Sequence, residues 1–407
     1  MQKICILINW VREIDMYMEL IKKIPKKNLL IIINDLYYSE IEKKNNTKEI
    51  LLSIKKKKLK YCFFSKIYNK KKFKLLLSTG DTWAKKVDLF SILKYIYAIT
   101  AGYIIEKTFL SEFFFKIFNR PLTGRNLKPT IYRNIIPEKN ISDIVIKYPW
   151  TMELNKKRFP DDRWKNNFDI FFTHGEYDSK LIKKKFNKSK TMIIGYPRYS
   201  NLAKKNFLRK KYSKLFRLKK NKKIIFWIPT HVDQNEEIAI NITNWLDKFQ
   251  KLLKYYNIII RPHSKTLKIC PTLVQDLSRK GFKVDDVNDR KIGELFKLAD
   301  IVIADYGGSV FSSIYLKKPT LLLNLSPSSK YLMHKKKIIT FDLLVRNKLV
   351  NLNTNTSFKK ILKSCREAYQ SKELKKIYLL KTKYFGKNNK VFNTKQVSRF
   401  LLKLMKQ

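Results

Sequence analysis

Residues 299–324 constrain the fold more than any other part of the chain. Ile301–Ala304 is a short apolar run with the length and composition of a buried parallel strand. A turn with two glycines follows, and then an apolar segment that is predicted to be a helix over 310–316. Pro319 ends that helix, and residues 320–323 form a second apolar run. Strand, glycine turn, helix and strand make a βαβ unit, so this part of the chain is predicted to belong to a parallel sheet.

The turn of this unit has the composition of an anion-binding site. Its residues are Asp305, Tyr306, Gly307, Gly308 and Ser309. Glycine lets a ligand approach the backbone closely, and a serine at the start of a helix can cap it. The free N–H groups and the positive end of the helix dipole would then face a phosphate group. A tight turn without a ligand is the alternative, and the turn alone does not decide between the two.

Two more predicted strands in the C-terminal half end in side chains that can bind or react. The apolar runs over 223–228 and 257–260 are the predicted strands. They are followed by a hydroxyl, a guanidinium and two imidazoles, on Thr230, His231, Arg261 and His263. Because the carboxyl ends of parallel strands meet at one edge of a sheet, these groups and the glycine turn are expected to face one ligand. A cation, imidazoles and a helix N-terminus suit a diphosphate.

The N-terminal half shows the same alternation of apolar runs and amphipathic segments. Strands are predicted over 3–9, 29–34, 61–64, 75–78, 168–173 and 191–194. His174 follows one of these strands, and Gly195 and Arg198 lie just after another. Three of the four histidines in the chain therefore follow predicted strands, which favours a functional role for them. A surface position is the alternative for Arg198, and a structural role is the alternative for each histidine.

These patterns predict an α/β fold with two Rossmann-like domains that face a cleft. A basic stretch that is poor in apolar residues separates the two halves. The expected boundaries are 1–202 for the N-terminal domain, 203–222 for a basic linker, 223–384 for the C-terminal domain and 385–407 for a closing helix. We expect the closing helix to pack back on the first domain.

The charge of the chain is extreme, with 88 Lys and Arg against 33 Asp and Glu, a formal net charge of +55. Such a charge attracts an anionic membrane, a polyanionic substrate or nucleic acid, unless it only reflects a lysine-rich background on a solvated surface. No zinc-finger spacing or aromatic nucleic-acid signature accompanies it, so no specific nucleic acid is expected. The most lipid-like stretch, 89–118, is interrupted by charges that leave only residues 95–105 uncharged, and this uncharged part is too short to span a bilayer. It is predicted to be a core helix or a helix that lies on a membrane face.

No metal site and no cofactor are predicted. The sequence has no HxxxH or HExxH pair, no GxxxxGK[ST] loop and no GxSxG elbow. The adjacent acidic pairs Asp161-Asp162 and Asp285-Asp286 are interpreted as loop charges. The four cysteines are dispersed along the chain, and we expect reduced thiols of a cytosolic protein.

On these residues the sequence resembles the CDP-glycerol glycerophosphotransferase family, the teichoic-acid polymerases and primases with a GT-B fold. The matching segments, in chain order, are 168–186, the Gly195-Tyr196-Pro197-Arg198 segment, 225–231, 260–263, 300–324 and 385–404. The resemblance therefore covers about 168–405 of the chain. Each segment is short, and the specificity of the resemblance comes from their combination.

The resemblance implies transfer of glycerol phosphate, or a related polyol phosphate, from a CDP-activated donor to a hydroxyl of a membrane-linked polymer or glycolipid acceptor, with CMP as the leaving group. It also implies a cytoplasmic enzyme that is peripheral on the inner face of the plasma membrane, with an acceptor-side first domain and a donor-binding second domain. His263 is expected to act on the donor phosphate. The residues expected to bind the donor diphosphate are Arg261, Thr230, His231, Asp305, Gly307, Gly308, Ser309 and Ser312, with Gly195 and Arg198 as further members of the site.

The sequence departs from the family pattern in its first domain. The W-H-G motif that carries the family's expected base has no counterpart, because residues 1–173 contain no histidine. His174 is therefore the candidate base on the acceptor side. Two alternatives stay open: a GT-B glycosyltransferase that uses a nucleotide sugar in capsule or lipopolysaccharide synthesis, and a non-enzymatic protein that binds polyanions or membranes.

Overall fold

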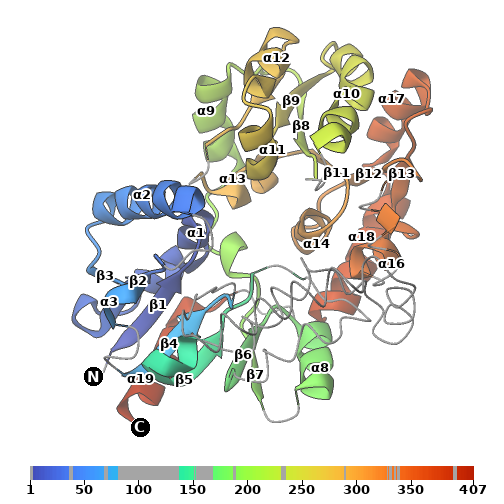
Figure 1. Cartoon of the computed structure of the whole chain (residues 1–407). Coiled ribbons are helices and arrows are strands. Elements are labelled where there is room, and N and C mark those ends of the chain that lie inside the picture. The colour runs from blue at the N-terminus through green and yellow to red at the C-terminus, as the bar shows by residue number, and fades with distance from the viewer. Residues whose placement is uncertain are drawn as a thin grey trace, which may run out of the picture. The chain divides into compact units, whose positions relative to one another are not determined.

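A computed structural model divides the chain into two units, each built on a parallel β-sheet (Figure 1). Unit 1 comprises Met1–Trp150, Lys157–Pro197 and Lys390–Gln407, and unit 2 comprises Thr151–Lys156 and Arg198–Asn389. The structure describes residues 3–35, 40–67, 72–80, 137–150, 152, 168–186, 189–230, 235–287, 290–327, 329, 332–333, 336, 340–387 and 392–407. His231 and the lipid-like stretch 89–118 lie outside the described residues.

The sheet of unit 1 has the strand order β3-β2-β1-β4-β5-β6-β7, and every neighbouring pair is parallel. Its strands are β1 (Ile4–Ile8), β2 (Leu29–Ile33), β3 (Tyr61–Phe63), β4 (Phe73–Ser78), β5 (Ser142–Lys147), β6 (Ile170–Thr173) and β7 (Lys190–Ile193). In the centre of this sheet, Ile6 is aligned with Ile31 of β2 and with Leu77 of β4. The continuous apolar sequences of β1 and β2 are those of strands buried on both faces.

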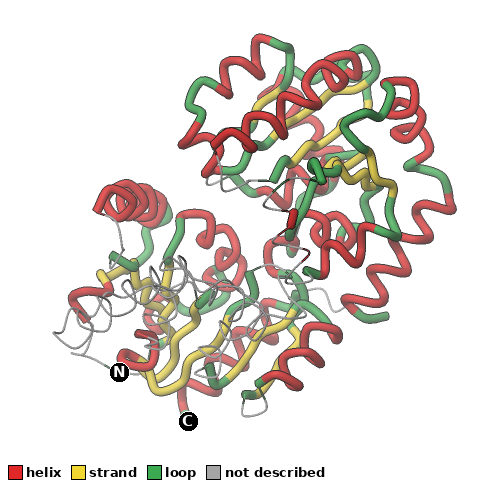
Figure 2. Tube along the Cα trace, turned by 45° about the vertical axis from the view of Figure 1, so that its right-hand side comes forward, coloured by secondary structure: helices red, strands yellow, loops and turns green. Residues whose placement is uncertain are grey.

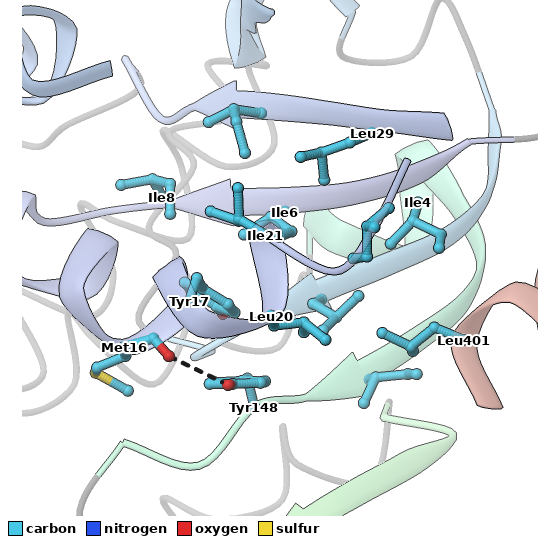
Figure 3. Close-up of a cluster of buried hydrophobic side chains, with 14 of the residues drawn as sticks. Ile4, Ile6, Ile8, Met16, Tyr17, Leu20, Ile21, Leu29, Tyr148 and Leu401 are labelled. Atoms are coloured by element: carbon cyan, nitrogen blue, oxygen red, sulfur yellow. Dashed lines mark hydrogen bonds between the residues drawn. The ribbon is translucent and has the colours of Figure 1, made fainter. Parts of the chain in front are cut away.

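Helices cover both faces of this sheet. They are α1 (Val11–Ile21), α2 (Glu40–Lys56), α3 (Phe64–Ile67), α7 (Pro137–Ile141), α8 (Glu176–Lys185) and α19 (Thr394–Lys406). Successive residues of β1 point to opposite faces, so Ile6 packs with α1 and α19 while Leu7 packs with α3 and α7. Figure 3 shows the first of these clusters, where Tyr17 and Leu20 of α1 lie against the sheet and the Tyr148 hydroxyl donates to the carbonyl of Met16 at 3.2 Å.

The C-terminal helix α19 completes the core of unit 1. Its buried side chains Val397, Leu401 and Met405 belong to the same cluster as β1 and α1. Leu401 lies beside that cluster in Figure 3. The prediction that the end of the chain packs back on the first Rossmann-like sheet is confirmed.

The sheet of unit 2 has the order β10-β9-β8-β11-β12-β13 and is also parallel throughout. Its strands are β8 (Lys223–Ile228), β9 (Tyr256–Ile260), β10 (Lys283–Val284), β11 (Ile301–Ala304), β12 (Thr320–Leu323) and β13 (Val350–Leu352). Its helices are α9 (Lys205–Phe216), α10 (Asn235–Leu252), α11 (Ser264–Ile269), α12 (Leu273–Arg279), α13 (Ile292–Leu298), α14 (Gly308–Tyr315), α16 (Phe341–Arg346), α17 (Phe358–Glu367) and α18 (Ser371–Phe385). Figure 2 shows the strands of each sheet side by side with helices around them.

Both sheets are doubly wound, as the sequence predicted. In unit 1 the chain runs outward from β1 to β2 and β3, and then returns to place β4 on the other side of β1. In unit 2 the chain runs from β8 to β9 and β10, and then returns to place β11 beside β8. Each sheet thus has one point where the strand order reverses, and ligands of open α/β sheets bind outside the carboxyl ends of the strands at such a point.

The stretch 203–222, predicted to be a basic linker, contains helix α9 and is part of unit 2. Leu208, Tyr212 and Phe216 are buried, and they recur every four residues on one face of the helix. The Tyr212 hydroxyl also donates to Glu294 at 2.8 Å. The lysines between the apolar positions lower the mean hydropathy, which concealed this amphipathic pattern in the sequence.

Candidate active site at the carboxyl edge of the second sheet

The loops after β8 and β11 meet where the strand order of unit 2 reverses. The backbone N–H of Thr230 donates to Oδ2 of Asp305 at 2.9 Å, which joins the two loops. Asp305 is only 1% exposed. The structure therefore brings together two of the residues that the sequence placed at one ligand site, at the position where such sheets bind ligands.

The glycine turn after β11 has a backbone conformation that other residues do not adopt. Gly307 has φ +90° and ψ −156°, a region that is essentially restricted to glycine. A Cβ atom at this position would meet no atom of the described residues within 4 Å. Among the described residues, that side of the backbone therefore leaves room for a ligand to come close.

Helix α14 begins at Gly308, and its N-cap is Gly307. The prediction that Ser309 caps the helix is wrong, because Ser309 lies inside the first helical turn and the N-cap residue has no side chain to accept a hydrogen bond. Ser312 is buried, and its hydroxyl donates to the carbonyl of Gly308 at 2.9 Å within the same helix. The Ser312 hydroxyl is thus engaged within α14.

Helix α16 holds the glycine turn in place. Oδ2 of Asp342 accepts the backbone N–H of Gly307 at 2.6 Å, and Asp342 is 3% exposed. A carboxylate at the positive end of α14 is favoured by the helix dipole. The backbone N–H of Gly307, one of the groups expected to face an anion, therefore already donates to a carboxylate of the protein.

Arg346, at the end of α16, also fixes this turn. Its guanidinium donates to the carbonyl of Asp305 and, at 2.7 Å, to the carbonyl of Leu323. It also lies 3.9 Å from the centre of the Tyr306 ring. Arg346 is 5% exposed, and burial lowers its pKa. The i, i+4 spacing of Asp342 and Arg346 puts both on one helix face, and that spacing was the only signal of their role in the sequence.

Arg261, predicted to bind the diphosphate, is engaged with the loop after β10. Its Nη1 donates to Oδ2 of Asp285 at 2.7 Å, and its Nη2 donates to the carbonyl of Val287 at 3.1 Å. Arg290 pairs with the other oxygen of Asp285, which is buried. Asp285 is thus a buried ion-pair partner and not the solvated loop charge that the sequence suggested. His263 is partly buried, and its carbonyl accepts the N–H of Leu267 in the first turn of α11.

The segment after β7 contains the other predicted site residues. Gly195 has φ +82°, a left-handed conformation that favours glycine. Unit 2 resumes at Arg198, and this residue lies against α13. If Gly293 of α13 carried a Cβ atom, that atom would lie only 2.7 Å from the carbonyl oxygen of Arg198. The Tyr199 ring contacts that of Phe296 with centroids 5.6 Å apart. Close packing therefore fixes the backbone at Arg198.

His174, the candidate base, lies in unit 1 at the carboxyl end of β6. Its ring is buried, with Nδ1 3.1 Å from Oδ2 of Asp178. The centre of its ring is 4.2 Å from that of Tyr196. Within the described ranges, no three His, Cys, Asp or Glu side chains gather where they could hold a metal ion. None of the described helices has the length and apolar character needed to cross a membrane.

Comparison with known proteins assigns the chain to a family. A sequence profile of the family described as CDP-glycerol:poly(glycerophosphate) glycerophosphotransferase matches residues 25–402. The chain belongs to this family. The match extends well into the N-terminal half, beyond the segments in which the sequence alone showed the resemblance.

The relatives of this glycerophosphotransferase-family chain include a teichoic-acid polymerase. The teichoic acid poly(glycerol phosphate) polymerase of Bacillus spizizenii is 28% identical over 179 residues, which are 42% of this chain and 44% of the relative. The aligned part thus spans less than half the length of that curated relative.

Solved structures with the same fold include the wall teichoic acid polymerase TagF. A TagF variant soaked with CDPG has a TM-score of 0.58 and 14% identity, and the match covers 100% of this chain and 89% of that one. A complex of Staphylococcus aureus MnaA with UDP has a TM-score of 0.50 and 10% identity, with coverage of 100% and 98%. At these identities the likeness concerns the fold, and it agrees with the predicted GT-B-like pair of Rossmann-like sheets.

Proposed function

We propose that this chain transfers glycerol phosphate, or a related polyol phosphate, from a CDP-activated donor to a hydroxyl of a membrane-linked polymer or glycolipid. The observation that carries the proposal is the family match over residues 25–402. The glycine turn at the carboxyl edge of the second sheet supports it, because an open turn before a helix N-terminus suits the diphosphate of such a donor.

The donor side of the reaction is assigned to unit 2. The diphosphate would be bound by the N–H groups of Gly308 and Ser309, on the open side of Gly307, since the Gly307 N–H already bonds to Asp342. His263 would act on the donor phosphate. Thr230, His231, Arg261, Asp305 and Ser312 complete the proposed donor residues, and Gly195 and Arg198 remain proposed members of the site.

The acceptor side is assigned to unit 1. In the proposed step, the acceptor oxygen forms a bond to the phosphorus that carries the glycerol. The bond from that phosphorus to the bridging oxygen breaks, and CMP leaves with the bonding electrons. The acceptor proton passes to a base, for which His174 is the candidate. No metal ion or cofactor takes part in this scheme.

A ligand panel tests the proposal through thermal stabilisation. The panel contains CDP-glycerol, CDP-ribitol, CMP, a UDP-sugar and a short oligonucleotide, each with the wild type and with His263→Ala. A ligand at 100 times its Kd should add about 2.7 kcal/mol to the stability. Arg279→Ala is the matched control, because it removes an exposed cation of α12 from the same unit.

Each outcome of the panel has a defined meaning. Stabilisation by a CDP compound that is reduced in His263→Ala and retained in Arg279→Ala supports the phosphotransferase. Stabilisation by the UDP-sugar alone would favour a nucleotide-sugar glycosyltransferase. A response to the oligonucleotide alone would refute both enzyme assignments.

We further propose that the protein works in the cytoplasm, bound peripherally to the anionic inner face of the plasma membrane. The formal net charge of +55 supports this, since basic residues near an anionic surface each contribute about 1 kcal/mol. Co-sedimentation should be strong with vesicles that contain anionic lipid, weak with neutral vesicles, and should fall steeply as salt is added. Equal binding to both kinds of vesicle would contradict the proposal.

A further inference from the structure

The side chain of Asp178 is surrounded by hydrogen-bond donors at the start of α8. Its Oδ1 accepts the backbone N–H groups of Gly175 at 2.9 Å and of Ser179 at 3.1 Å. Its Oδ2 accepts the backbone N–H of His174 at 2.8 Å and faces Nδ1 of the same residue at 3.1 Å. An ionised carboxylate offers only acceptor sites, and here three backbone donors are already directed at it.

This arrangement decides where the imidazole proton lies. Because an ionised Asp178 can only accept, a hydrogen bond across the 3.1 Å contact requires that Nδ1 of His174 carry the hydrogen. In a neutral imidazole the other nitrogen, Nε2, then has the free lone pair. The ring of Tyr196 packs on the imidazole and restricts its rotation.

The lone pair on Nε2 has no hydrogen-bond partner among the described residues, and the side chain of His174 is 3% exposed. Buried polar atoms are nearly always paired, so an unpaired one needs a specific explanation. Capping of α8 does not explain the unpaired Nε2. The backbone N–H groups that donate to Asp178 would have their hydrogen bonds even if residue 174 had no imidazole. His174 lies at the carboxyl end of β6, the edge of the sheet on which open α/β proteins bind ligands, and this points to a hydroxyl group of a ligand as the partner.

We propose that Asp178 is a positioning residue that fixes His174 as the Nδ1–H tautomer, so that Nε2 receives the proton of the acceptor hydroxyl. This inference rests on the proposed glycerophosphate transfer. As the acceptor oxygen bonds to phosphorus and CMP leaves, the hydroxyl proton moves to Nε2, and the resulting imidazolium is stabilised by the carboxylate of Asp178. Release of that proton to water restores the neutral ring.

Nitrogen NMR of the full chain tests the tautomer without any assumption about activity. The protein has only four histidines, so labelling them with ¹⁵N gives few signals. One ring should show a protonated Nδ1 and an unprotonated Nε2, and its signals should be absent from His174→Gln. In Asp178→Asn the amide can donate to Nδ1, and the ring should change to the Nε2–H tautomer. A wild-type His174 ring with hydrogen on Nε2 would overturn the inference.

Kinetics with CDP-glycerol and a lipid-linked glycerol phosphate primer test the role. His174→Gln and Asp178→Asn should each lower kcat by about a hundredfold or more, because general bases contribute on that order. The KM for CDP-glycerol should change less than twofold, and the double variant should lose about as much as the worse single variant. Glu176→Gln is the matched control, since it neutralises an exposed carboxylate in the same helical turn.

The outcomes separate this inference from the proposed function. If the wild type transfers nothing from any CDP-polyol, the proposed function fails. The NMR experiment then still tests the tautomer of His174, because it does not depend on activity. If the wild type is active and folded Asp178→Asn keeps the wild-type kcat, Asp178 has only a structural role. Thermal unfolding identifies variants that do not fold, and the less disruptive Asp178→Glu should then recover the Nδ1–H tautomer and part of kcat.

Discussion

Removal of the Asp342 carboxylate should loosen the glycine turn that we assign to the donor diphosphate. The bond from Gly307 N–H to Asp342 is short, at 2.6 Å, and its acceptor is buried. Hydrogen bonds to charged groups contribute about 1.5–3 kcal/mol, and neutral ones about 0.5–1.5 kcal/mol. Asp342→Ala should therefore destabilise unit 2 by about 1.5–3 kcal/mol, and Asp342→Asn, which keeps an oxygen acceptor, by about half as much.

Two measurements check this prediction. For a unit of this size, the loss in Asp342→Ala corresponds to a fall in Tm of about 3–12 °C. Hydrogen exchange of a peptide that covers residues 305–310 should become faster in Asp342→Ala and stay close to the wild-type rate in Asp342→Asn. Because the variants differ in whether an acceptor oxygen is present, the comparison isolates the contact with Gly307.

The reasoning would be refuted by an Asp342→Ala protein whose Tm and exchange rates equal those of the wild type. It would also be refuted if both variants lost the same stability, since the negative charge and not the acceptor would then be decisive. A gain in affinity for CDP-glycerol in Asp342→Asn with an intact turn would show that the carboxylate repels the donor phosphates.

Three further predictions concern other parts of unit 2. Gly307→Ala should cost about 1–3 kcal/mol because of its positive φ, whereas Gly308→Ala, in the first turn of α14, should cost little; urea unfolding compares the two. Gly293→Ala would bring a Cβ within 2.7 Å of the carbonyl of Arg198, so Tm should fall by the equivalent of about 1–3 kcal/mol, and an unchanged Tm would argue against that packing. Burial lowers the pKa of Lys318 from 10.5 to about 7, and the nearby Lys205 adds to this shift. Between pH 7 and pH 10.5 the unfolded chain therefore binds more protons at Lys318 than the folded chain does, so the stability of the fold should rise with pH over this range. In Lys318→Met this rise should be smaller, and equal pH profiles of unfolding would show that Lys318 is not the source.

The elements with strong local patterns could be predicted from the sequence. The strand, turn, helix and strand over 301–323 are present as β11, α14 and β12, because their apolar runs and glycines act within a few residues of each other. The start of α14 was misplaced by two residues, since the positive φ of Gly307 ends the turn before Ser309 can act as a cap. The alternation of predicted strands and helices, which occurs in both halves of the sequence, likewise predicted both parallel sheets.

The side-chain partners of the site residues could not be predicted. Asp342 lies 35 residues from Gly307, and Asp285 lies 24 residues from Arg261. No local pattern specifies which distant carboxylate meets which donor, because the path of the intervening chain decides it. The buried position of His174 also depends on packing against Tyr196, which the spacing of histidines does not reveal.

The return of α19 to unit 1 has a consequence for how the protein is made. The chain leaves unit 1 at Pro197 and re-enters it at Lys390. Val397 and Leu401, which cover part of the first sheet, are therefore synthesised after all of its strands. At about 5–20 residues per second, a ribosome needs on the order of 10–40 s to synthesise the intervening part. During that interval the nascent chain exposes an apolar strip on a finished sheet, which is a surface for chaperones. A chain that terminates early, before α19, would keep that strip exposed and be prone to aggregate.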